Sequence, residues 1–103
     1  MAKKQPKNKI EQVQELIPYG SDHPITAKQI SKLTAIPLRG VYGIVRYLLV
    51  HGNVPIGALR DDDKHGYFII TSEEERQATL APLCSHAKEI EERISCIKAI
   101  QIE

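Results

Sequence analysis

The stretch from Pro24 to Ile70 constrains the fold more than any other part of this chain. It contains two amphipathic helical patterns that a turn at residues 34–37 separates, followed by two short apolar runs on either side of a charged loop. Short helices followed by a hairpin indicate an α+β domain with one modest core. The 103 residues of the chain are enough for one such domain and no more.

Capping residues and apolar spacing predict three helices before the hairpin. Asn8 can cap the first helix and Thr26 the second, whereas Pro37 opens a third helix that stops at His51-Gly52. The apolar residues that these helices should bury recur three or four positions apart. They are Ile10, Val13, Leu16 and Ile17 in the first helix, Ala27, Ile30 and Leu33 in the second, and Val41, Ile44, Val45 and Leu48 in the third.

Two apolar runs after the third helix predict the strands of a hairpin. The runs are Val54–Ile56 and Tyr67–Ile70, and residues 57–66 would close the hairpin between them. Pro55 is tolerable if the first strand lies at an edge of the sheet. Alternation along the second strand puts one of Tyr67 and Phe68 inside and the other outside, and for either residue core packing is a better expectation than a binding role.

A long C-terminal helix should begin at a capping box made by Ser72 and Glu75. Pro82 lies inside this helix and should kink or split it near Ala81. Six apolar residues along the helix follow one another at spacings of 3, 4, 3, 4 and 3, which is a heptad seam. They are Leu80, Leu83, Ala87, Ile90, Ile94 and Ile97.

The seam has two possible uses, because it can pack against the rest of the chain or pair two chains. In a parallel pair Arg93 would face Lys98 of the second chain, and Ala87 would leave a shallow centre. An antiparallel pair or a helix-swapped dimer therefore stays open.

A net charge of +1 conceals an uneven distribution of charged residues. Residues 1–22 carry four lysines and three acidic residues, residues 23–60 five basic residues and no acidic one, and residues 61–103 five basic and ten acidic residues. A folded segment with one sign of charge suits a polyanionic partner such as nucleic acid.

Several classes of function find no support in the sequence. Cys84 and Cys96 are twelve positions apart on one predicted helix, too far for a disulfide, so a reduced cytoplasmic protein is expected. No apolar run is long enough to span a bilayer, so no membrane partner is expected. The four histidines are dispersed, which argues against a metal or another cofactor. No nucleophile, base and orienting group assemble in a catalytic motif, so we expect no enzyme activity.

The predicted order of helix, short strand, helix, turn, helix, strand, wing and strand resembles the winged helix-turn-helix family. The resemblance covers Ile25 to Ile70, about half of the chain. Small winged-helix proteins of bacteriophages and other mobile elements are similar in further details. They share an opening like Pro24-Ile25-Thr26, a Gly66-Tyr67 pair at the last strand, and a trailing helix like that from Glu73.

This resemblance implies a three-helix core with a β-hairpin wing and a long C-terminal amphipathic helix. The chain would divide into a disordered basic tail at residues 1–7, the winged domain at 8–71 and the C-terminal helix at 72–103. Its implied function is to bind double-stranded DNA and to regulate transcription or replication of a phage or mobile element. Homodimerisation through the trailing helix is implied as well.

The same resemblance places the third helix in a major groove of DNA and the hairpin against the neighbouring backbone. Arg39 and Arg46 are seven positions apart, so they share one face, and either could bind a guanine or a phosphate. The expected DNA-contacting residues are Lys28, Lys32, Leu38, Arg39, Tyr42, Gly43, Arg46, Tyr47, Arg60 and Lys64.

Two features favour a protein partner instead. The wing contains three consecutive acidic residues, Asp61–Asp63, which would repel phosphates. The third helix should also expose Leu38, Leu49 and Val50 beside its tyrosines, a composition typical of protein-binding sites. The alternative is therefore a winged-helix module that binds a host replication or transcription protein.

Overall fold

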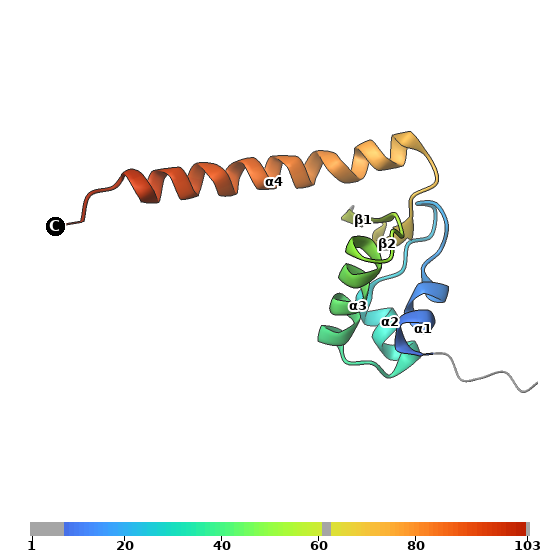
Figure 1. Cartoon of the computed structure of the whole chain (residues 1–103). Coiled ribbons are helices and arrows are strands. Elements are labelled where there is room, and N and C mark those ends of the chain that lie inside the picture. Colours follow the sequence, from blue (N-terminus) through green and yellow to red (C-terminus); the bar gives the residue numbers. More distant parts are fainter. Residues whose placement is uncertain (1–7, 61–62, 103) are drawn as a thin grey trace, which may run out of the picture.

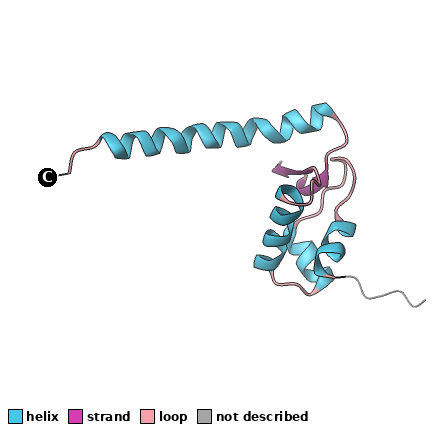
Figure 2. Ribbon diagram, viewed as in Figure 1, coloured by secondary structure: helices cyan, strands magenta, loops and turns pink. Residues whose placement is uncertain are grey.

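The computed structural model describes residues 8–60 and 63–102 and confirms an α+β architecture. A small globular part holds three helices and a two-stranded antiparallel hairpin, and a long fourth helix projects from it (Figures 1 and 2). The N-terminal tail predicted at residues 1–7 lies outside the described residues, as do Asp61 and Asp62 of the predicted wing. The elements are α1 (Lys9–Leu16), α2 (Ala27–Thr34), α3 (Leu38–Val50), β1 (Ile56–Arg60), β2 (His65–Ile69) and α4 (Glu73–Ala99).

The first two helices begin at the capping residues that the sequence predicts. The side chain of Asn8 accepts a hydrogen bond from the backbone N–H of Glu11 at 2.8 Å. Thr26 accepts one from the backbone N–H of Gln29 at 3.1 Å, and the Gln29 side chain accepts one from the N–H of Thr26 at 2.9 Å. These bonds satisfy donors that the first turn of a helix otherwise leaves unpaired.

A turn of three residues joins α2 to α3 and fixes the angle between them. Ala35 adopts a left-handed conformation with φ of 61°, which ends α2. The hydroxyl of Ser31 donates to the carbonyl of Ile36, and the hydroxyl of Thr34 accepts from the N–H of Ile36 at 3.3 Å. Between α2 and α3 the chain bends by 110°. No single helix in the described part of the chain is long and apolar enough to cross a membrane, and α2 and α3 pass that test only as this bent pair.

The core lies among α1, α2, α3 and one face of the hairpin. Most of the predicted apolar positions point into it, but Leu33 does not, because 68% of its surface is exposed on the outer side of α2. The buried residues that form this cluster are Val13, Ile17, Ala27, Ile30, Ile36, Val41, Val45, Leu48, Ile56 and Ile69.

The strands of the hairpin are placed differently from the prediction. β1 begins at Ile56 and runs to Arg60, and β2 begins at His65, so four residues separate the strands where the prediction placed residues 57–66 between them. Apolar runs did not mark these ends, because Gly57, Ala58 and Arg60 on β1 and His65 and Gly66 on β2 are small or polar. Ile25 also pairs with Tyr67, at 3.0 and 2.6 Å for the two backbone hydrogen bonds, and lies on the open side of β2.

The second face of the hairpin carries a separate buried residue, Phe68, which is 1% exposed. Phe68 pairs with Gly57 in the register of the hairpin, and both lie next to Thr79 in the second turn of α4. The first turns of α4 therefore cover this face of the hairpin.

Beyond those turns α4 stands apart from the globular part, and the molecule measures 72 × 33 × 25 Å (Figure 1). The predicted split at Pro82 does not occur, because α4 is one continuous helix from Glu73 to Ala99. Pro82 has no N–H for the helical bond to the carbonyl of Ala78, but α4 is exposed there, so water can reach that carbonyl. Packing of the heptad seam against the globular part is not seen, since all six seam residues are exposed.

Candidate nucleic-acid interface

The outer face of α3 is organised around one row of residues. Arg39, Gly43, Arg46 and Val50 follow one another at spacings of four, three and four, so they lie in line along the helix. All four are exposed, and they lie opposite the stripe of α3 that the core buries. Because the core holds the inner stripe, this row is fixed in its outward orientation.

Gly43 is the open point of the row, between the two arginines. A Cβ atom built on Gly43 would meet no other atom within 4 Å. Gly40 is different, because a Cβ atom there would lie 2.9 Å from the Ile36 side chain. The intramolecular packing therefore explains the glycine at 40 but not the one at 43, where a partner could approach the backbone closely.

One edge of the row meets the hairpin. Burial raises the pKa of Tyr67 on β2 above its ordinary value of 10.0, the Tyr42 hydroxyl on α3 raises it further, and Arg60 on β1 lowers it. Tyr42 and Arg60 are thus each close enough to Tyr67 to act on its charge. The sequence predicted core packing for Tyr67, and the structure places it half-buried at this junction, packed against the core cluster. Tyr67 lies on the same face of the hairpin as Arg60, because it pairs with Ala58, two residues before Arg60 on β1. The sequence could not show this without the register of the two strands.

The other edge of the row carries an aromatic pair. Tyr47 lies beside His51, the C-cap of α3, with ring centroids 5.6 Å apart and ring planes inclined by 39°. Tyr47 is 48% exposed, and Tyr42 on the opposite edge is 51% exposed. Two half-exposed phenol groups thus flank the arginine row and can donate hydrogen bonds outward.

The basic side chains of α2 and α3 form no ion pair with another residue in the described part of the chain. Lys28 and Lys32 are exposed on α2, one turn apart, and neither they nor the arginines of α3 form an ion pair with a described residue. The segment from residue 23 to residue 60 contains no acidic side chain. The basic groups are therefore available to an external anion.

Nine of the ten predicted contact residues are exposed: Lys28, Lys32, Arg39, Tyr42, Gly43, Arg46, Tyr47, Arg60 and Lys64. Leu38 is the exception, because it is partly buried and packs against the core. It is the first residue of α3, directly after Pro37. The expectation that Leu38 points outward was therefore wrong.

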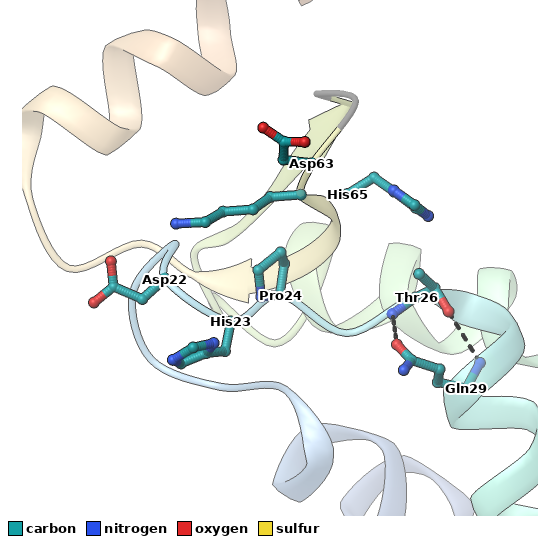
Figure 3. Close-up of a pocket in the computed structure, with 8 residues that line it drawn as sticks. Asp22, His23, Pro24, Thr26, Gln29, Asp63 and His65 are labelled. Atoms are coloured by element: carbon teal, nitrogen blue, oxygen red, sulfur yellow. Dashed lines mark hydrogen bonds between the residues drawn. The ribbon is translucent and has the colours of Figure 1, made fainter.

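Acidic groups collect at the far end of the hairpin. An open hollow there is lined by the loop before α2 and the end of the hairpin, including Asp22, His23, Asp63 and His65 (Figure 3). The two histidines point away from each other, and no group of three or more potential ligands in the described residues could hold a metal ion.

Comparisons of this chain with protein-family models, with curated proteins and with solved structures gave no match.

Proposed function

We propose that this chain is a winged helix-turn-helix protein that binds double-stranded DNA through the outer face of α3. The two helices α2 and α3 meet at 110° through a three-residue turn, a geometry typical of a helix-turn-helix. The hairpin β1–β2 would be the wing, and the Ile25–Tyr67 bridge would supply its third strand.

The observation that carries this proposal is the row formed by Arg39, Gly43 and Arg46. A helix lies deep in the major groove only if its exposed face tolerates close approach, and Gly43 provides that point. The guanidinium groups on either side of it can bind guanine edges or phosphates.

The flanking residues would hold the helix in the groove through the DNA backbone. Tyr42 and Tyr47 can donate to phosphates on the two sides of the row, and Arg60 adds a cation beside Tyr42. Lys28 and Lys32 would add non-specific attraction from α2. Binding of this kind needs no cofactor and acts by occupying the site, which regulates transcription or replication of a phage or mobile element. Such a role requires a cytoplasmic location.

Chemical-shift mapping of the isotope-labelled protein with a random-sequence duplex tests the proposed face directly. The largest backbone shifts are expected in residues 38–50 and around Arg60, and α4 beyond Thr79 serves as an internal control. Shifts confined to α4, or none at low salt, would contradict the proposal.

A second candidate, a winged-helix module that binds a host replication or transcription protein, is favoured by the apolar groups near the end of α3. Leu49 and Val50 are 48% and 55% exposed, and Leu33 on α2 is 68% exposed. Exposed apolar groups beside tyrosine and arginine are typical of protein-binding sites, and Asp63 would face a basic surface. This candidate predicts no affinity for DNA at low salt.

A further inference from the structure

The heptad seam of α4 is uncovered along its whole length. Among its large residues the exposed fraction runs from 38% at Ile90 to 65% at Ile97, and Ala87 is exposed too. α4 has 27 residues, so it is about 40 Å long, yet only its first turns contact the globular part. A helix that projects alone into water gains no tertiary packing, and an apolar seam on it favours association with another helix.

We propose that α4 pairs with α4 of a second copy in the antiparallel direction, with Ala87 of each chain packed against Ile90 of the other. The seam then forms three kinds of layer, each occurring twice. In these layers Leu80 meets the partner's Ile97, Leu83 meets the partner's Ile94, and Ala87 meets the partner's Ile90.

The sizes of the central residues select this direction. In a parallel pair Ala87 would face Ala87, which leaves a hollow layer, and Ile90 would face Ile90 in the next. In the antiparallel pair each of the two central layers combines one small and one large residue. Packing at uniform density is favoured because an unfilled layer loses dispersion contacts and leaves a cavity.

The charges beside the seam select the same direction. A parallel pair brings Arg93 against the partner's Lys98, which is repulsive. In the antiparallel pair Lys98 lies opposite Gln77. Glu91 then lies opposite Cys84, and Arg93 opposite His86, a pair with one formal charge at pH 7. No two like formal charges meet across the seam in this arrangement.

Disulfide trapping distinguishes the two directions. Both native cysteines are exposed and unpaired, so Cys84→Ser with Cys96→Ser provides a background without thiols. One preparation adds Leu83→Cys and a second, carrying a mass tag, adds Ile94→Cys. The two are mixed, allowed to exchange, oxidised mildly and analysed by mass spectrometry under non-reducing conditions.

The antiparallel pair predicts that the mixed disulfide between the two preparations dominates. Leu83 and its counterpart in the second copy would be eleven residues apart along the axis, about 16 Å, which is beyond the reach of a disulfide. Dominant homodisulfides of Leu83→Cys would establish a parallel pair and overturn the proposal. Cross-linking no greater than that of Ser85→Cys, on the outer side of the helix, would also overturn it.

A compensating pair of substitutions gives a second test, read by sedimentation equilibrium without DNA. Ala87→Ile alone should weaken the dimer, because two large residues then share each central layer. Ala87→Ile with Ile90→Ala restores one small and one large residue per layer and should recover most of the affinity. A stronger dimer from Ala87→Ile alone, or a wild-type monomer at high micromolar concentration, would refute the antiparallel pair. Neither test involves the α3 face, so failure of the pairing and failure of DNA binding are separate outcomes.

Discussion

The carboxylate of Glu75 accepts a hydrogen bond of 2.8 Å from the backbone N–H of Ser21, 54 residues earlier in the chain. The same carboxylate accepts two more from the N–H and the hydroxyl of Thr71, at 2.8 and 3.0 Å. The capping box predicted for α4 is thus only half formed. Ser72 accepts from the N–H of Glu75, but the Glu75 side chain binds Thr71 and Ser21. This carboxylate ties the first turn of α4 to the loop between α1 and α2.

We expect Glu75→Gln to destabilise the protein at neutral pH and much less in acid. Hydrogen bonds from Thr71, with those from Ser21, lower the pKa of Glu75 from 4.5 to about 2. A lowered folded-state pKa means that the stabilisation is complete above pH 4.5 and disappears as the pH falls towards 2. Thermal unfolding of both proteins across this range measures the effect. Glu74→Gln, which removes a charge in the same turn, is the control, and an equal pH dependence for both variants would contradict the assignment.

Gly43→Ala should stabilise the protein and weaken DNA binding at the same time. An alanine in the exposed middle of α3 gains about 0.5–1 kcal/mol over glycine, and its Cβ meets no other atom. In the proposed complex that Cβ would stand where the helix approaches the groove. Denaturant unfolding and fluorescence anisotropy with duplex DNA measure the two effects. A variant that is more stable and binds DNA as tightly as wild type would show that nothing approaches Gly43.

Gly57→Ala should be destabilising, in contrast to the substitution at Gly43. A Cβ atom at Gly57 would lie 2.6 Å from the Phe68 ring and 2.7 Å from the Thr79 hydroxyl, on the face that α4 covers. Overpacking of this kind costs about 1–3 kcal/mol. The midpoint of urea unfolding reports it. An unchanged midpoint would mean that α4 does not press on the hairpin there.

Thr79→Val should stabilise the same contact. The Thr79 hydroxyl is buried and has no hydrogen-bond partner among the described residues, and valine keeps the shape of the side chain without the polar atom. Removing a buried unsatisfied hydroxyl is worth about 1 kcal/mol, which corresponds to a rise in Tm of about 4–8 °C for a domain of this size. Thr79→Ser, which keeps the hydroxyl, should give no such rise. A fall in Tm for the valine variant would contradict the burial.

The ionisation of Tyr67 reports the junction between α3 and the hairpin. Arg60 lowers the pKa of this phenol, so Arg60→Ala should raise it further, whereas Tyr42→Phe should lower it. Because the folded-state pKa is raised, the associated stabilisation is complete below pH 10 and declines as the pH rises through the folded-state pKa. Carbon-detected NMR of the labelled tyrosine rings resolves the titration. If neither variant changes the pKa of Tyr67, then Tyr42 and Arg60 do not lie beside it and the described junction is wrong.

Local signals in the sequence predicted most of the helices, because caps and apolar spacing act within one or two turns. Asn8, Thr26 and Ser72 each accept the backbone bond expected of an N-cap. The strand ends were not predictable in the same way. Arg60 and His65 extend the hairpin through pairing with each other, and neither is apolar.

The covering of apolar faces was equally beyond the sequence. Periodicity shows that Leu33 and the α4 seam lie on apolar faces, but it cannot show whether another part of the chain covers them. For the candidate site, helical spacing gave the shared face of Arg39 and Arg46. Spacing does not show, however, that a side chain at position 40 would clash and one at position 43 would not. That difference depends on where the Ile36 side chain packs.

The most direct test of the central claim is the affinity of the protein for a labelled random-sequence duplex, measured by anisotropy at several salt concentrations. We expect binding that weakens steeply as salt rises, because phosphate contacts release counterions. Arg39→Ala with Arg46→Ala should weaken binding. Each arginine that contacts a base should cost about 1–3 kcal/mol of binding free energy, and each that contacts a phosphate should make the affinity depend less steeply on salt. Arg76→Ala with Lys88→Ala removes the same charge from α4 and should have little effect. No binding at low salt, or equal affinity for both double variants, would contradict the assignment of α3 as a DNA-binding face.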